Sequence, residues 1–136
     1  MINLEQYESF SFPLHGCLTD ELDGIINTHK EFMCEILQKV LSLNKKVFIL
    51  TKSFKIDDYY SLTAKKKNER LDETKTIEKI LDKLNLDKNL IIYTNGNSYY
   101  HYINNSNTHL HFDSSKYELL LFKEHSSINC FDINNL

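Results

Sequence analysis

The sequence predicts a single α+β domain in which two helices pack on one face of a four- to five-stranded, mainly antiparallel sheet. Two stretches carry apolar residues at helical spacing, and the last third consists of short segments separated by turn residues. The chain has 136 residues, of which 41% are hydrophobic and 26% charged. This length and composition are typical of one compact core, so we expect one domain over residues 1–136.

The first half of the chain is expected to supply both helices and two strands. Residues 10–14 alternate in hydrophobicity before a turn, which predicts a short edge strand. Apolar residues three and four positions apart predict a helix over residues 20–43. The β-branched and aromatic run 47–51 predicts a buried strand. A second helix is expected to begin at Asp72 or Thr74.

The last third is predicted to form an antiparallel meander. Asn95-Gly96 is the strongest short hairpin signal, because a type I′ turn requires positive φ at both central residues. Asparagine and serine pairs farther along favour two more tight turns. The expected strands are residues 90–94, 99–103, 109–113 and 117–123, with 128–133 as a possible last strand.

Charge and cysteine content narrow the classes of partner and the compartment. The net charge is −3 and Arg70 is the only arginine, which disfavours nucleic acid because phosphate recognition relies on clustered cations. No apolar run approaches membrane-spanning length, so no membrane partner is expected. Three cysteines without a secretory signal indicate reduced thiols in the cytoplasm.

No common catalytic motif occurs in the sequence. Phosphate-binding glycine loops, the nucleophile elbow and the HExxH zinc motif are all missing. The sequence therefore predicts no catalytic residue, no cofactor and no bound metal.

The meander register predicts a partner-binding surface on the sheet face that the helices leave uncovered. Tyrosine is enriched in the cores of protein interfaces, where it serves as an anchor. A small acidic domain of this kind fits a stoichiometric inhibitor of the immunity-protein type, drawn by charge to a basic toxin domain of bacterial origin. The predicted surface consists of Tyr93, Tyr100, Tyr102, His109, His111 and Glu118.

Two alternative interpretations of the same residues stay open. The polar side chains could be purely structural, since His111 with Glu118 is an ordinary cross-strand pair. The domain could instead be a small enzyme that uses this polar face. In that case His109, His111 and Glu118 would form a two-histidine, one-carboxylate metal site, or His111 with Glu118 would act as a base beside Tyr100. The HxH spacing is a weak signal, so the protein-binding interpretation is the one we carry forward.

Overall fold

The computed structural model describes residues 2–19, 30–54 and 63–135, and these residues form a five-stranded sheet. Its strand order is β3-β2-β1-β4-β5, and every neighbouring pair is parallel. The strands are β1 (Ser9–Pro13), β2 (Lys46–Thr51), β3 (Ile91–Tyr93), β4 (His109–Asp113) and β5 (Asn129–Asp132). The α-helices are α1 (Lys30–Ser42), α2 (Ala64–Lys83) and α3 (Lys116–His125). Short 3₁₀ helices are η1 (Leu4–Gln6), η3 (Lys88–Leu90), η4 (Tyr99–Tyr102) and η5 (Ile133–Asn135).

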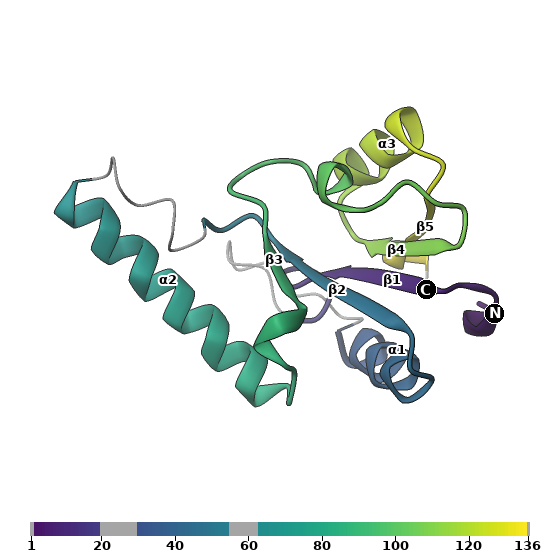
Figure 1. Cartoon of the computed structure of the whole chain (residues 1–136), viewed down its shortest axis with the longest axis horizontal. Coiled ribbons are helices and arrows are strands. Elements are labelled where there is room, and N and C mark those ends of the chain that lie inside the picture. Colours follow the sequence, from purple (N-terminus) through teal and green to yellow (C-terminus); the bar gives the residue numbers. More distant parts are fainter. Residues whose placement is uncertain (1, 20–29, 55–62, 136) are drawn as a thin grey trace.

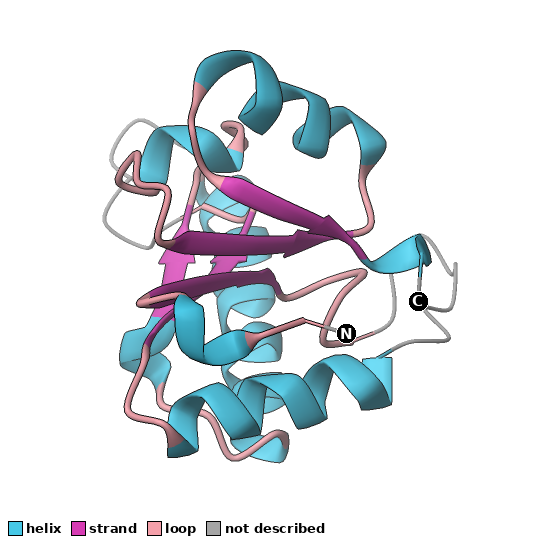
Figure 2. Cartoon of the chain, turned by 90° about the vertical axis from the view of Figure 1, so that its right-hand side faces the viewer, coloured by secondary structure: helices cyan, strands magenta, loops and turns pink. Residues whose placement is uncertain are grey.

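The sheet lies between two layers of helices. Helices α1 and α2 pack on one face, and α3 with η4 packs on the other (Figure 1). Figure 2 shows the strands as a central layer with helices above and below it. The α1 side holds the larger core cluster, in which Phe12 of β1 stacks on Phe112 of β4 with ring centroids 5.0 Å apart. Strands β1 and β4, which we call the two central strands, are therefore buried on both faces.

The parallel sheet contradicts the predicted antiparallel meander. Residues 117–123 were expected to be a strand, but they belong to α3, which connects β4 to β5. Residues 99–103 were also expected to be a strand, and 99–102 form the 3₁₀ helix η4 on the way from β3 to β4. A crossover with a helix returns the chain to the same end of the sheet, so the strands that it joins run parallel. The sheet face expected to stay open is therefore covered.

A serine cap explains why residues 117–123 are helical. Ser115 is the N-cap of α3, and its Oγ accepts a hydrogen bond from the backbone N–H of Glu118 at 3.2 Å. The S-x-x-E spacing of Ser115 and Glu118 is the signature of a capping box, and the leucines that follow favour a helix. This local signal was present in the sequence and outweighs the apolar run that suggested a strand.

Asn95-Gly96 adopts the predicted turn conformation, but the turn does not connect two antiparallel strands. Both residues have positive φ, 53° at Asn95 and 80° at Gly96. The backbone N–H of Gly96 donates to the carbonyl of Lys52, which ties this turn to the end of β2 at 2.7 Å. No antiparallel partner strand follows the turn within residues 97–135.

Several predicted elements are confirmed, with shifted bounds or roles. Helix α1 buries Met33, Ile36, Leu37 and Val40, which belong to the predicted apolar stripe. The start predicted for this helix, at residue 20, lies outside the described residues. Strand β1 was expected at an edge and occupies the centre of the sheet. Helix α2 begins after its cap Thr63, well before the predicted start, because lysine and glutamate are good helix formers.

Candidate functional site

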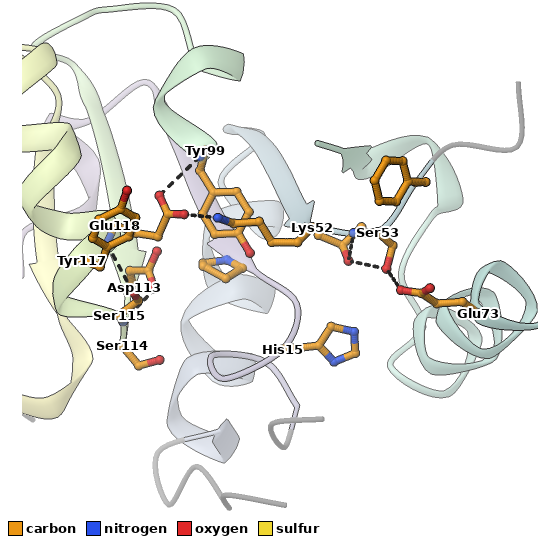
Figure 3. A pocket seen from close by; sticks show the side chains of 13 residues that line it. His15, Lys52, Ser53, Glu73, Tyr99, Asp113, Ser114, Ser115, Tyr117 and Glu118 are labelled. Carbon is orange, nitrogen blue, oxygen red and sulfur yellow. Dashed lines mark hydrogen bonds and ion pairs between the residues drawn. The ribbon is translucent and has the colours of Figure 1, made fainter. Parts of the chain in front are cut away.

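A pocket lies at the carboxyl ends of the central strands. The strand order reverses between β1 and β4, and ligands of open parallel sheets bind at the carboxyl edge beside such a reversal. We call this cavity of about 520 Å³ the edge pocket (Figure 3). Its lining comes from the ends of β1, β2 and β4, from α2 and α3, and from η4. The lining residues are Pro13, His15, Thr51, Lys52, Ser53, Phe54, Glu73, Tyr99, Asp113, Ser114, Ser115, Tyr117 and Glu118.

Lys52 and Glu118 form an ion pair across the edge pocket. Lys52 follows β2, and its Nζ donates to Oε1 of Glu118 on α3. The same ammonium lies 4.9 Å from the ring centroid of Tyr99, which adds a cation–π contact. The other Glu118 oxygen accepts the backbone N–H of Tyr99 at 3.4 Å. The Glu118 side chain is 4% exposed, so its charge is compensated by Lys52 rather than by solvent.

The α2 side of the edge pocket carries a second carboxylate. Ser53 donates its hydroxyl to Oε1 of Glu73. Phe54 lies beside this pair, and the guanidinium of Arg70 lies 3.7 Å from the centroid of its ring. Unlike Glu118, Glu73 is exposed and makes no ion pair among the described residues.

Asp113 ends β4 and bonds to the N-cap residue of α3. Its Oδ1 accepts the backbone N–H of Ser115 at 2.9 Å, and its Oδ2 lies 2.8 Å from Nε2 of His111. The Ser115 hydroxyl in turn accepts the backbone N–H of Glu118 in the first turn of α3. A helix N-terminus favours negative charge, so the position of Asp113 just before α3 suits a carboxylate.

A row of polar side chains runs from Asp113 back along the two central strands. Oγ of Ser11 lies 2.6 Å from Nδ1 of His111 and 2.8 Å from Nε2 of His109. Nδ1 of His109 lies 2.7 Å from Oγ of Ser9. We call Ser9, Ser11, His109, His111 and Asp113 the polar seam. All of its members except the partly exposed Ser9 are buried.

Burial controls the charge of His109. Loss of solvation, and next the neighbouring His111, lowers the pKa of His109 from its ordinary 6.5 to about 4. His109 is therefore neutral at pH 7. Aromatic rings cover the seam, and Phe122 of α3 stacks on His111 with centroids 4.2 Å apart.

Neither the seam nor the nearby thiol supplies an accessible nucleophile. Ser11, His111 and Asp113 have the hydrogen-bond connectivity of a serine-hydrolase triad, but Ser11 is 0% exposed and no substrate can reach its hydroxyl. Burial, followed by the effect of Asp113, raises the pKa of the Cys17 thiol, which keeps it protonated. The edge pocket therefore offers carboxylates, hydroxyls, one lysine and the imidazole of His15.

The six residues predicted to form a partner-binding surface do not share one exposed face. His109 and His111 are adjacent on one face of β4, as expected, but they lie beneath α3 and η4. Glu118 projects from α3 into the edge pocket, and His111 bonds to Asp113 in its place. A predicted His111–Glu118 pairing across antiparallel strands is thus wrong.

The three tyrosines of that predicted surface are partly buried and lie on two elements, Tyr93 on β3 and the other two on η4. Tyr93 ends β3, and Tyr100 of η4 stacks on His125 with centroids 4.9 Å apart. Tyr102 donates its hydroxyl to the carbonyl of Thr94 at 2.9 Å. Binding of a protein partner through these residues stays a prediction.

Sequence reasoning missed Lys52, Asp113 and Tyr99 as site residues. A signal for Asp113 and Ser115 existed in the S-x-x-E cap that directly follows a strand. Lys52 and Tyr99 carry no such local signal, because they reach the edge pocket only through the parallel order of the strands.

The geometry of the edge pocket is the main evidence for the function. Across residues 2–19, 30–54 and 63–135, no group of three or more His, Cys, Asp or Glu side chains converges as metal ligands would. In the same part of the chain, no helix combines the length and apolar character needed to cross a membrane. Comparison of the chain with protein-family models, curated proteins and solved structures gives no significant match.

Proposed function

We propose that the chain binds a small hydroxylated ligand that carries an amino group, in the edge pocket. The observation that carries this proposal is the charge of the lining at a strand-order reversal. Among the described residues that line the edge pocket, three are acidic, Glu73, Asp113 and Glu118, and one is a lysine, Lys52. Lys52 is already paired with Glu118, so the lining favours a positively charged ligand.

The other lining groups fit the same class of ligand. Hydroxyls of Ser53, Ser114 and Ser115 can exchange hydrogen bonds with ligand hydroxyls. The exposed ring of Tyr117 offers an aromatic face, which attracts ammonium groups. A phosphate is disfavoured, because the carboxylates of Glu73, Asp113 and Glu118 outnumber the one lysine of the lining.

A titration with three matched sugars tests the proposal. Glucosamine, glucose and glucose 6-phosphate present a cation, a neutral group and an anion on one framework. Backbone amide shifts of Ser53 and Ser114, measured by NMR, report occupancy of the edge pocket. We expect glucosamine to bind more tightly than glucose, and glucose more tightly than glucose 6-phosphate. Tighter binding of the phosphorylated sugar would refute the proposed charge preference.

A charge variant separates the electrostatic contribution from general damage. Glu73→Gln removes one exposed carboxylate and keeps the side-chain shape, so glucosamine should bind about 1.5- to 5-fold more weakly while glucose is unaffected. Glu69→Gln, on the same helix but outside the lining, is the matched control. An equal loss for both sugars would contradict the electrostatic argument.

A stoichiometric protein partner is the second candidate function. Tyr117 and Leu120, one turn apart on α3, are 65% and 50% exposed, and exposed apolar side chains of this size are typical interface anchors. The net charge of −3 would favour a basic partner, as in an immunity protein that inhibits a basic toxin domain.

The gene next to that of this chain supplies the test of the second candidate. If its product is basic, calorimetry should detect a one-to-one complex that the Tyr117→Ala, Leu120→Ala double variant weakens by about 30-fold or more. Phe32→Ala on α1, which removes another exposed ring, is the control. Absence of a complex, or an equal loss with Phe32→Ala, would remove this candidate.

We also propose a cytoplasmic location. Cys17, Cys34 and Cys130 are free thiols, which suits a reducing compartment. Cell fractionation tests this location, and recovery of the chain from an oxidising compartment would contradict it.

A further inference from the structure

The polar seam breaks the usual rule for buried parallel strands. Such strands are nearly continuous runs of hydrophobic residues, because helices cover both faces. Phe10, Phe12 and Phe112 obey this rule on the α1 side. On the α3 side of the same two strands the positions hold serine, histidine and aspartate instead. Buried polar groups without an evident packing advantage concentrate at functional sites.

The hydrogen bonds of the seam have only one consistent direction when Asp113 is ionised and both imidazoles are neutral. An ionised carboxylate only accepts, so His111 must donate from Nε2 and accept at Nδ1. Ser11 must then donate to His111 and accept from Nε2 of His109. Nδ1 of His109 in turn accepts from the Ser9 hydroxyl. Every proton of the seam therefore points toward Asp113.

The opposite direction is equally consistent once Asp113 holds a proton. The Nε2 proton of His111 passes to Asp113, the Ser11 proton passes to Nδ1 of His111, and the Nε2 proton of His109 passes to Ser11. The Ser9 proton passes to Nδ1 of His109, and a hydronium ion or buffer acid at Ser9 replaces it. Each intermediate group gains one proton and loses one, so the net change is one proton taken from solvent and one added to Asp113.

We propose that the polar seam is a proton relay that loads Asp113 from solvent at Ser9, so that Asp113 acts as an acid toward a ligand in the edge pocket. This inference rests on the proposed binding function of that pocket. Asp113 lines the edge pocket, and Ser9 is partly exposed at the opposite end of the strands. Positions 109 and 113 are four steps apart along β4, so the relay spans about 13 Å.

The rings over the seam support this role. Phe122 and Tyr99 lie 4.2 and 6.1 Å from His111 between centroids, and Phe48 lies 6.2 Å from His109. They keep the seam out of solvent, which leaves the side chains themselves as the path for a proton. The low pKa of His109 fits a neutral imidazole that passes protons without holding a charge.

Nitrogen-15 NMR of histidine side chains tests the coupling. In the wild type we expect both His109 and His111 to carry the proton on Nε2. Asp113→Asn should reverse both, because the Ser115 N–H fixes the amide oxygen at the Oδ1 position and turns the amide N–H toward His111. The seam hydrogen bonds of His109 go to Ser9 and Ser11 and not to position 113, so its reversal must pass through Ser11.

Two serine variants separate a relay from a purely structural network. With Ser11→Ala added to Asp113→Asn, His111 should stay reversed while His109 loses its single tautomer. Ser9→Ala in the wild-type background should leave the tautomer of His111 unchanged and slow exchange of its Nε2 proton with deuterated water. The Ser9→Ala measurement stands even where Asp113→Asn fails to fold.

Three results would overturn the relay. They are a wild-type His109 protonated on Nδ1, a doubly protonated His111 at pH 7, and an exchange rate that Ser9→Ala does not change. Glucosamine titration of the same samples separates the two proposals. Binding with uncoupled histidines refutes the relay alone, whereas coupled histidines without binding refute only the ligand proposed for the edge pocket.

Discussion

The buried His109 should make the fold sensitive to mild acid. Its pKa is about 4 in the folded chain and 6.5 in the unfolded chain, so the unfolded state binds an extra proton between these values. Stability is therefore complete above pH 6.5 and falls as the pH drops toward 4. The full difference corresponds to ~3.4 kcal/mol, of which ~2 kcal/mol is lost between pH 7.5 and pH 5. A loss of this size is large against the ~5–15 kcal/mol total stability of a typical domain.

Urea unfolding followed by circular dichroism measures this loss. We expect the wild type to lose ~2 kcal/mol more than His109→Gln between pH 7.5 and pH 5, because glutamine does not titrate. His101→Gln, which removes an exposed histidine, should keep the wild-type slope. The comparison stops at pH 5 because ordinary carboxylates begin to titrate below it. Equal losses in wild type and His109→Gln would refute the reasoning.

Three substitutions and one control substitution test local features of the fold by urea unfolding. Gly96→Ala should cost ~1–2 kcal/mol, because the new Cβ would meet only Phe54 at 3.8 Å and the penalty comes from φ of +80°; no loss would contradict this backbone argument. Ser115→Ala should cost ~1 kcal/mol through loss of the α3 cap, and an unchanged stability would show that the cap is dispensable. Phe12→Ala should cost ~3–5 kcal/mol, since the ring is fully buried. Tyr117→Ala removes an exposed ring and should change the free energy of unfolding by no more than ~0.5 kcal/mol. Similar costs for Phe12→Ala and Tyr117→Ala would contradict the burial of Phe12.

Part of the candidate site could be predicted from the sequence. The alternation of His109 and His111 correctly indicated that both imidazoles share one face of a strand. Their partner could not be identified, because the antiparallel register placed Glu118 opposite His111. In the parallel sheet the contacts come from Ser11 of β1 and from Asp113 of β4 itself.

Short-range interactions in the sequence determined much of the local structure. The apolar spacing gives α1, the β-branched run gives β2, and the Asn95-Gly96 pair gives positive φ angles, because each depends on residues only a few positions apart. The S-x-x-E cap that starts α3 belongs to the same class of information. Such signals fix the conformation of a segment without fixing which segment becomes its neighbour.

Only the tertiary structure decided strand direction, the burial of the polar seam and the composition of the edge pocket. Lys52, Tyr99 and Glu118 meet there from the end of β2, from η4 and from α3. They meet because helical crossovers bring every strand back in the same direction, so that the carboxyl ends gather at one edge. Strand pairing depends on the burial of whole sheet faces rather than on local propensity. When one helical segment is assigned as a strand, the predicted direction of every later strand is therefore reversed.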